Sequence, residues 1–182
     1  MRRVRYRFLP EVDGADLLFV CAGSNDLMAR RSLEEWTEDL DAVLDGAVRR
    51  GRHVVACSAG QLYRSPALMA TLRSVLREWT DTQTEASAAI CARRGIPFVD
   101  VAHCDLNEGF WAADGFHPSA AGYEMAADMV AVAMVDALAA NTRSTWGRSA
   151  RSWPGLMAEV DAGLQELTHD DNGHNGPSRL IV

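Results

Sequence analysis

The segment Asp114-Gly115-Phe116-His117-Pro118 places a carboxylate and an imidazole three residues apart. In this arrangement the carboxylate can fix the tautomer of the imidazole, and the histidine can then take and return a proton. The same spacing also occurs where an aspartate lies in a turn and a histidine caps the next helix. We predict that Asp114 and His117 form the acid–base half of a hydrolytic centre, which would also need a nucleophile.

A second candidate for chemistry is Asn25, which lies in the turn Gly23-Ser24-Asn25-Asp26 after an apolar run. Its side-chain amide could donate an N–H to an oxyanion, although an asparagine in a turn also commonly bonds to nearby backbone. Gly23 would let the backbone turn sharply, and Ser58 opens the loop after the next apolar run. We therefore predict Asn25 as a catalytic residue, and Gly23 and Ser58 as residues that contact the substrate.

Three short apolar segments alternate with longer segments that have helical periodicity. The predicted strands are 15–22, 53–57 and 98–101, and the predicted helices run over 32–50, from 66 to about 94, and from 118 to about 140. Ser32 and Glu35 have the spacing of a capping box. A second helix that is broken near Asp81 is the alternative to a continuous one. Pro118 suits the first position of the third helix, with His117 just before it. This alternation predicts an α/β fold, in which helices cover both faces of a parallel sheet.

The predicted sheet would bring the candidate residues together. Ligands of parallel sheets bind beyond the carboxyl ends of the strands, and the loops 23–26, 58–60 and 103–117 all lie at that edge. The third loop also contains Phe110 and Trp111. We predict that these two aromatic residues form an apolar wall of the substrate site, with a role as hydrophobic anchors of the loop as the alternative.

The two ends of the chain are less regular. Residues 1–13 are basic and are predicted to be helical, with an edge strand over Arg2–Phe8 as the alternative. The predicted domain covers residues 1–140. Residues 141–182 are predicted to form a C-terminal extension that contains one helix, at about 154–167, and a flexible tail.

The composition excludes several classes of protein. Hydrophobic residues make up 48% of the 182 residues, as in ordinary globular proteins, and the formal charge of −7 makes nucleic acid an unfavourable partner. No apolar run reaches the roughly 18 residues of a membrane-spanning helix, so we predict no integral membrane segment. The four cysteines lack the paired spacing of metal sites. We therefore predict buried free thiols, no metal and no cofactor.

The two candidate segments together resemble the blocks of a known family. Gly23-Ser24-Asn25-Asp26 is similar to the G-x-N-D block of the SGNH hydrolases (the GDSL-type esterases and lipases), and Asp114-Gly115-Phe116-His117-Pro118 is similar to their D-G-x-H-P block. The resemblance covers roughly 15–138. It implies a three-layer α/β/α flavodoxin-like sandwich and hydrolysis of carboxylic esters. It also implies that Asn25 is an oxyanion donor, His117 the general base and Asp114 its orienting carboxylate.

One part of the family pattern has no match in this sequence. The family's nucleophilic serine lies in a Gly-Asp-Ser block, and a second block contributes a glycine N–H to the oxyanion; neither block precedes Gly23. No pattern marks Ser24, Ser58, Cys57 or Cys104 as a replacement nucleophile. We therefore predict a truncated, poorly active hydrolase that lacks N-terminal strands and has an exposed edge on the first predicted strand.

The alternative function is a non-catalytic binding or interaction module that keeps this fold. Such a module could self-associate through the exposed strand edge, because an unpaired strand is a template for pairing. As a hydrolase, the protein would act on a small-molecule ester, either a lipid or an acylated sugar. The sequence as given predicts a cytoplasmic location, with a signal peptide in a missing N-terminal part as the alternative.

Overall fold

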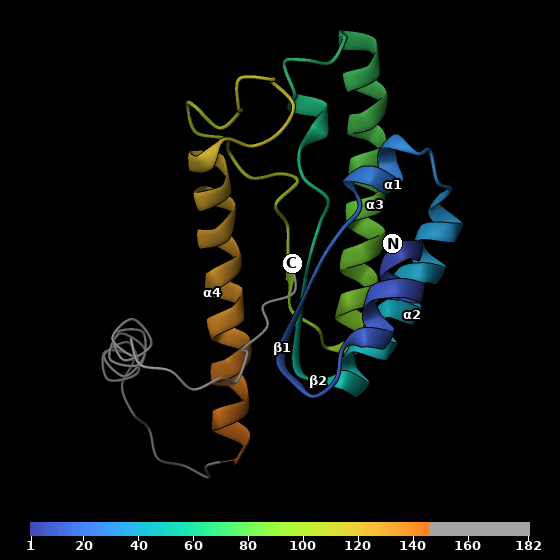
Figure 1. Ribbon diagram of the computed structural model, residues 1–182, viewed down its shortest axis with the longest axis vertical. Coiled ribbons are helices and arrows are strands. Elements are labelled where there is room, and N and C mark those ends of the chain that lie inside the picture. The colour runs from blue at the N-terminus through green and yellow to red at the C-terminus, as the bar shows by residue number, and fades with distance from the viewer. Residues whose placement is uncertain (146–182) are drawn as a thin grey trace. The chain divides into compact units, whose positions relative to one another are not determined.

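The computed structural model describes residues 1–145, with side-chain surroundings as far as residue 139, and helices alternate with parallel strands in it (Figure 1). In chain order the elements are η1 (Val4–Phe8), η2 (Leu9–Glu11), β1 (Ala15–Cys21), α1 (Ser24–Met28), α2 (Leu33–Arg50), β2 (Gly51–Cys57), η3 (Leu62–Arg64), α3 (Ala70–Arg94), β3 (Phe98–Val99) and α4 (Ala120–Thr145). η1 is a π-helical turn, and η2 is a 3₁₀ turn. The N-terminal residues are thus helical, as predicted, and the alternative of a strand over Arg2–Phe8 is wrong.

The sheet contains three strands in the order β1-β2-β3, and both pairs are parallel. β1 and β2 are in register from Ala15 opposite Gly51 to Cys21 opposite Cys57. The carboxyl ends of the strands therefore lie at one edge of the sheet, where the loops that follow them begin. The predicted α/β fold with a parallel sheet is confirmed.

β1 differs from the buried strand that its sequence predicts. Val20 is the one buried residue among its seven. Within residues 1–145, β1 pairs with β2 alone and has no second ladder partner. A short apolar run fits a strand that is buried on both sides or on one, and local sequence does not separate the two cases.

β3 is limited to Phe98 and Val99, although the sequence predicts a strand over 98–101. Oδ1 of Asp100 accepts hydrogen bonds from the backbone N–H groups of Ala102 and His103, at 3.0 and 3.2 Å. An aspartate that bonds to the backbone two and three residues ahead favours a turn over a strand. The chain leaves the sheet at this point and begins the long loop that leads to α4.

The two long helices α2 and α3 begin and end close to the predicted positions. The capping box before α2 is formed, because the Ser32 hydroxyl accepts the backbone N–H of Glu35 and the Glu35 carboxylate accepts the N–H of Ser32. α3 begins at Ala70, later than the predicted start at Pro66. It continues through Asp81 without the break that was the alternative.

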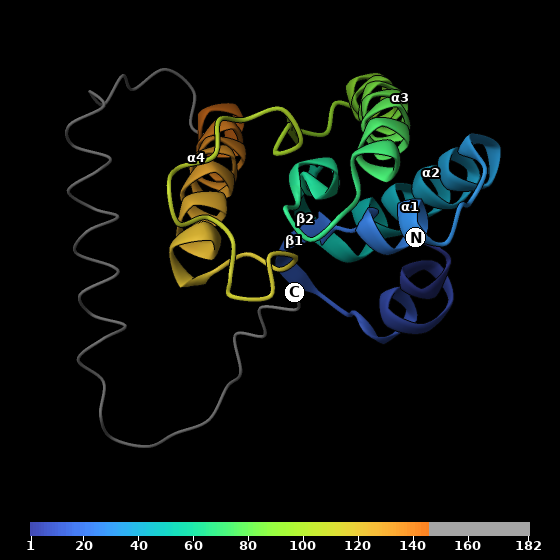
Figure 2. The same cartoon turned by 90° about the horizontal axis from the view of Figure 1, so that it is seen from above.

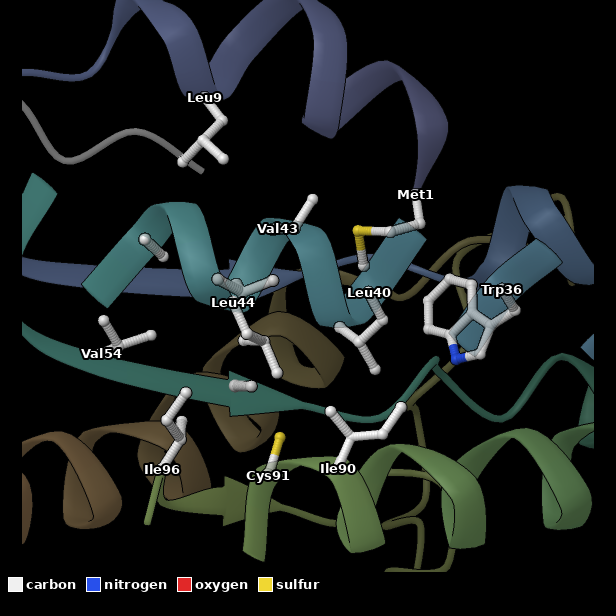
Figure 3. Close-up of a cluster of buried hydrophobic side chains, with 13 residues drawn as sticks. Met1, Leu9, Trp36, Leu40, Val43, Leu44, Val54, Ile90, Cys91 and Ile96 are labelled. Carbon is white, nitrogen blue, oxygen red and sulfur yellow. The ribbon is translucent and has the colours of Figure 1, made fainter. Parts of the chain in front are cut away.

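The main hydrophobic core lies between the sheet and the helices α2 and α3, which cover one face of it (Figures 2 and 3). Its buried side chains come from the N-terminal residues, both helices and the strands, and they include Met1, Leu9, Trp36, Leu40, Val43, Leu44, Val54 and Ile90. The indole N–H of Trp36 donates to the hydroxyl of Ser87 on α3, at 2.9 Å. Leu33 is 43% exposed because it is the first residue of α2.

α4 begins at Ala120, two residues after the predicted start at Pro118. Pro118 forms an antiparallel bridge with Trp111 and is therefore part of an extended segment. The hydroxyl of Ser119 accepts the backbone N–H of Gly122 at 3.1 Å, as the cap of a helix does. Ser119, and neither His117 nor Pro118, is thus the residue that opens α4.

The predicted helix at about 154–167 and the predicted tail lie outside the described residues. The predicted domain boundary at residue 140 stays a prediction. Among the helices of residues 1–145, none combines the length and the apolar character that crossing a membrane requires.

Candidate active site

Asp114 and His117 form a hydrogen-bonded pair in the loop between β3 and α4. Oδ2 of Asp114 lies 2.7 Å from Nδ1 of His117. Oδ1 of the same carboxylate accepts the backbone N–H groups of Phe116 and His117, at 2.9 and 3.0 Å. Gly115 has a φ of 66°, which lets the chain turn tightly between the two side chains. Both oxygens of Asp114 are engaged, so the orientation of the imidazole is fixed.

The electrostatics of this pair favour a charged aspartate that orients the imidazole. The hydrogen bond with His117, helped by the two backbone N–H groups, lowers the pKa of Asp114 to about 2. An anionic Asp114 accepts a proton-bearing Nδ1, which leaves Nε2 with its lone pair. Nε2 has no hydrogen-bond partner within residues 1–145, and the His117 side chain is 66% exposed. His117 is therefore arranged to act as a base toward a molecule in solution.

Ser65, which the sequence analysis did not identify, holds this loop from the protein interior. Its side chain is fully buried, and its hydroxyl donates to the carbonyl oxygen of Gly115 at 2.7 Å. On the other side of the loop, the N–H of Ala112 donates to the carbonyl oxygen of His117 at 2.9 Å. Ser65 lies 50 residues from Gly115 in the sequence, so no local pattern could have indicated this contact.

Gly23 and Asn25 lie at the start of α1, where the sequence predicted a turn. Gly23 has a φ of 132°, a conformation that residues with a side chain rarely adopt. A Cβ atom at this position would lie 2.9 Å from Cβ of Ala59 and 3.0 Å from Oε1 of Gln83, so there is no room for one. Asn25 is the second residue of α1, and its exposed side chain makes no hydrogen bond within the described part of the chain.

The segment 58–67 connects the start of α1 with the loop that contains Asp114 and His117. At one end the backbone N–H of Gly60 donates to the Ser24 hydroxyl at 3.3 Å. At the other end lies the contact with Gly115 described above. Leu27 of α1 belongs to a second buried cluster, and Phe116 packs against that cluster. The two predicted catalytic segments thus contact the same part of the protein.

The other predicted substrate-binding residues lie in different surroundings. Ser58 is 3% exposed, and its hydroxyl accepts the N–H of Ala102 at 2.9 Å, so it is engaged within the protein. Phe110 and Trp111 are half-buried, and their rings meet edge to face with centroids 4.9 Å apart. Through its bridge with Pro118, Trp111 also closes the loop around His117.

A second aspartate–histidine pair, Asp100 and His103, lies at the start of the same loop. Nδ1 of His103 is 2.7 Å from Oδ2 of Asp100, and Nε2 is 2.9 Å from Oδ1 of Asp81 on α3. The hydrogen bonds with Asp81 and then with Asp100 raise the pKa of His103. The sequence analysis did not select this pair, although its Asp-x-x-His spacing was a visible signal. Because both ring nitrogens are engaged, His103 is not arranged as a base.

The residues considered as replacement nucleophiles have partners other than His117. The Ser24 hydroxyl accepts from Gly60, as described above. The side-chain amide of Gln61 lies 2.7 Å from the carbonyl oxygen of Cys104 and 2.9 Å from its sulfur. Neither Ser24 nor Cys104 forms a hydrogen bond with His117 in the described structure.

Comparisons with known proteins identify a family and similar folds. The model of the GDSL-like lipase/acylhydrolase family matches residues 2–125. LAE5, an α/β hydrolase from the metagenome of Lake Arreo, Spain, has a similar structure, with a TM-score of 0.57 and 18% identity over 73% of this chain and 66% of its own. A protein of Parabacteroides merdae that is named a GDSL-like lipase has a TM-score of 0.53 and 20% identity over 73% of this chain and 65% of its own. The chain thus spans about two thirds of the length of both structures. No curated protein sequence matches it significantly.

Proposed function

Because the chain belongs to the GDSL-like lipase/acylhydrolase family, we propose that it contributes the acid–base and oxyanion-binding residues of a carboxylic ester hydrolase. In this proposal His117 is the general base, Asp114 orients it, and Asn25 donates to the oxyanion. One observation carries the proposal. It is the 2.7 Å hydrogen bond between Asp114 and Nδ1 of His117, which leaves Nε2 without a partner in the described residues.

In the proposed reaction the proton moves through His117. Nε2 takes the proton of the attacking O–H group as this group adds to the ester carbonyl, and it returns the proton to the leaving alkoxide. Asp114 stays anionic because its pKa is low, and it stabilises the imidazolium that forms. The side-chain N–H of Asn25 would offset the negative charge that develops on the carbonyl oxygen.

The nucleophile is the part of the reaction that these residues do not supply. No segment of the 182 residues matches the family's Gly-Asp-Ser block. In our proposal, the group that attacks the ester in this chain is therefore water, activated by His117. Serine hydrolases that have lost a triad member keep an acceleration of only about 10³–10⁴ over the reaction in water, so we expect slow turnover.

The proposed substrate is a small-molecule ester, either a lipid or an acylated sugar. The half-buried rings of Phe110 and Trp111 support an apolar acyl group, because they lie in the loop that contains His117. A short acyl chain needs only this local apolar surface. Nitrophenyl acetate and butyrate are therefore suitable first probes.

The proposal is tested by measuring hydrolysis of these two esters by the wild-type chain and two variants. We expect Asn25→Asp, which keeps the shape of the side chain but has no N–H donor, to lower the rate about 10²-fold, as the loss of an oxyanion donor typically does. We expect His117→Ala to lower it by about 10²-fold or more. The matched control is Asn107→Asp, which changes an exposed asparagine in the loop that contains His117 and should leave the rate unchanged.

Two results would contradict the proposal. One is a wild-type rate that His117→Ala does not change, because the base would then lie elsewhere. The other is a complete loss of hydrolysis in Ser24→Ala with His117→Ala unaffected, because a serine of this chain would then act without the proposed pair.

A second proposed function, a non-catalytic interaction module, is favoured by the exposed side of β1. In residues 1–145 this strand pairs with β2 alone, and strands with an unpaired edge add strands from other chains. We expect such a module to form dimers as its concentration rises, as measured by size-exclusion chromatography with light scattering. A monomer at every concentration would reject self-association through β1.

A further inference from the structure

Two free cysteines lie side by side at the carboxyl edge of the sheet. Cys21 is the last residue of β1 and Cys57 the last of β2, and the two are direct partners in the parallel ladder. Partners in a ladder point their side chains to the same face of the sheet. Neighbouring strands lie about 4.8 Å apart, which is within the range of roughly 4.4–6.8 Å between the Cα atoms of disulfide-bonded cysteines. The spacing of the two strands at this pair is therefore within the range that a disulfide can span.

The two thiols differ in their surroundings. Cys21 is exposed and Cys57 is buried. The Cys57 thiol donates a hydrogen bond to the sulfur of Cys21, which lowers the pKa of Cys21 to about 7 and raises the pKa of Cys57. At neutral pH the exposed Cys21 is thus partly in the thiolate form, and it lies beside the protonated Cys57 thiol. Cys91 offers a contrast, because burial in the core raises its pKa to about 11.

We propose that Cys21 and Cys57 form a reversible dithiol–disulfide site that reacts with hydroperoxides. Cys21 is the attacking sulfur, because it is exposed, and Cys57 is the resolving sulfur, because it lies beside Cys21. This site is independent of the proposed ester hydrolysis and uses none of its residues.

The reaction balances with a hydroperoxide as the oxidant. The Cys21 thiolate attacks one peroxide oxygen, the O–O bond breaks, and the products are Cys21 sulfenic acid and hydroxide (an alkoxide for an organic peroxide), which takes up a proton. The Cys57 sulfur then attacks the Cys21 sulfur, the S–S bond forms, and the hydroxyl leaves as water with the proton of Cys57. The two sulfurs together lose two electrons and the peroxide gains two.

The position of this site connects it to the loops that follow the strands. Gly23 comes two residues after Cys21, and Ser58 comes directly after Cys57. These loops already touch, since a Cβ at Gly23 would lie 2.9 Å from Cβ of Ala59. The disulfide would therefore join the bases of two loops that are in contact, without moving one toward the other over any distance.

The test is to treat the full chain with hydrogen peroxide at neutral pH and to measure the intact mass and the non-reduced peptide map. We expect a loss of two hydrogen atoms, a cross-linked peptide pair that contains Cys21 and Cys57, and full recovery with dithiothreitol. Cys57→Ser should instead accumulate a sulfenic acid on Cys21, which a 1,3-dione traps. Cys91→Ser is the control and should oxidise like the wild type.

A second measurement keeps the proposal testable even where Cys57→Ser does not fold. The rate at which iodoacetamide alkylates Cys21 in the wild type should reach half its maximum near pH 7. A midpoint at or above about 8.5, the value of an ordinary thiol, would overturn the proposal. So would a disulfide that forms only between the Cys21 residues of two chains, or oxidation confined to Cys104.

Discussion

The loop between β3 and α4 contains two Asp-x-x-His segments, 100–103 and 114–117, that fold in the same way. In both, Oδ1 of the aspartate accepts two backbone N–H groups, and Oδ2 lies 2.7 Å from Nδ1 of the histidine. They differ at the other ring nitrogen. Nε2 of His103 lies 2.9 Å from Asp81, whereas Nε2 of His117 has no partner in the described residues. The Asp-x-x-His spacing produces the hydrogen-bonded pair. A third residue, such as Asp81 at Nε2 of His103, then decides whether the histidine can act as a base.

The two segments also differ in how they are held by the rest of the protein. Asp100 also lies 3.4 Å from the Ser58 hydroxyl, so the first segment joins β2, β3 and α3. The second segment is fixed through its backbone, by Ser65, and the side chains of Asp114 and His117 are 50% and 66% exposed. One sequence pattern therefore serves as a structural link in one place and as a candidate base in the other. Each of the following predictions separates these two roles.

The largest expected effect is the loss of ester hydrolysis in Asp114→Asn. The neutral amide lacks the negative charge that holds the proton of His117 on Nδ1, so the histidine loses its fixed tautomer. We therefore expect the rate to fall about 10²-fold. Asp100→Asn is the matched variant in the other segment and should change the rate per folded molecule by less than about twofold. Both rates are measured as hydrolysis of nitrophenyl acetate. Equal losses of rate in the two variants would contradict the different roles of the two segments.

The second prediction reverses the comparison, with stability as the measurement. Asp100→Asn weakens bonds to the N–H of the buried Ala102 and to Ser58, so we expect the free energy of unfolding to fall by about 1–2 kcal/mol. Asp114→Asn removes contacts at the surface and should cost less. Urea unfolding followed by circular dichroism gives both values. A larger loss of unfolding free energy in Asp114→Asn than in Asp100→Asn would contradict the structural role of segment 100–103.

The third prediction concerns the charge of Asp114. Its pKa lies near 2 chiefly because of the hydrogen bond with His117, so we expect its carboxyl carbon to titrate near pH 2 in an NMR experiment. In His117→Ala the pKa should rise toward the ordinary value of about 3.9 but stay below it, because the two backbone N–H groups remain. The contribution of this carboxylate to stability is present above about pH 4 and is lost as the pH falls through 2. An unchanged pKa in His117→Ala would contradict the hydrogen bond.

The smallest expected effect is the dependence of stability on the protonation of His103. The pKa of this histidine is raised in the folded protein, so its contribution is complete below its unfolded pKa of about 6.5 and is lost as the pH rises through the higher folded value. The groups are about half exposed, so we expect His103→Gln to cost only about 0.2–1 kcal/mol at pH 5.5 and less at pH 9. Asp81→Asn should show the same trend in urea unfolding. A loss that grows with pH would have the wrong sign.

The parts of the site that could be predicted from the sequence are local. The capping box of Ser32 and Glu35 and the neighbourhood of Asp114 and His117 depend on residues three positions apart, and the alternation of strands and helices predicted that their loops share one edge. The contact of Ser65 with Gly115 spans 50 residues, and that of Asp81 with His103 spans 22. Such contacts follow from how α3 and the loops pack, and no short pattern encodes them.

Burial was the other property that local sequence did not determine. The apolar run of β1 predicted a buried strand, yet only Val20 is buried, because burial depends on what lies against each side. The start of α4 shows the same limit. Proline suits a first helical position, but the bridge of Trp111 with Pro118 competes for that residue, and Ser119 becomes the cap.

The small loop that the bridge between Trp111 and Pro118 closes has a consequence for the order of folding. The hydrogen bonds from the N–H of Ala112 to the carbonyl oxygen of His117 and from the N–H of Ser119 to that of Phe110 join residues fewer than ten positions apart. Chain segments of this length close in roughly 10–100 ns, long before the pairing of parallel strands, which must bring distant residues together. Asp114 and His117 can therefore meet early during folding. Packing of the sheet and of Ser65 against the loop then turns a transient encounter into a fixed geometry.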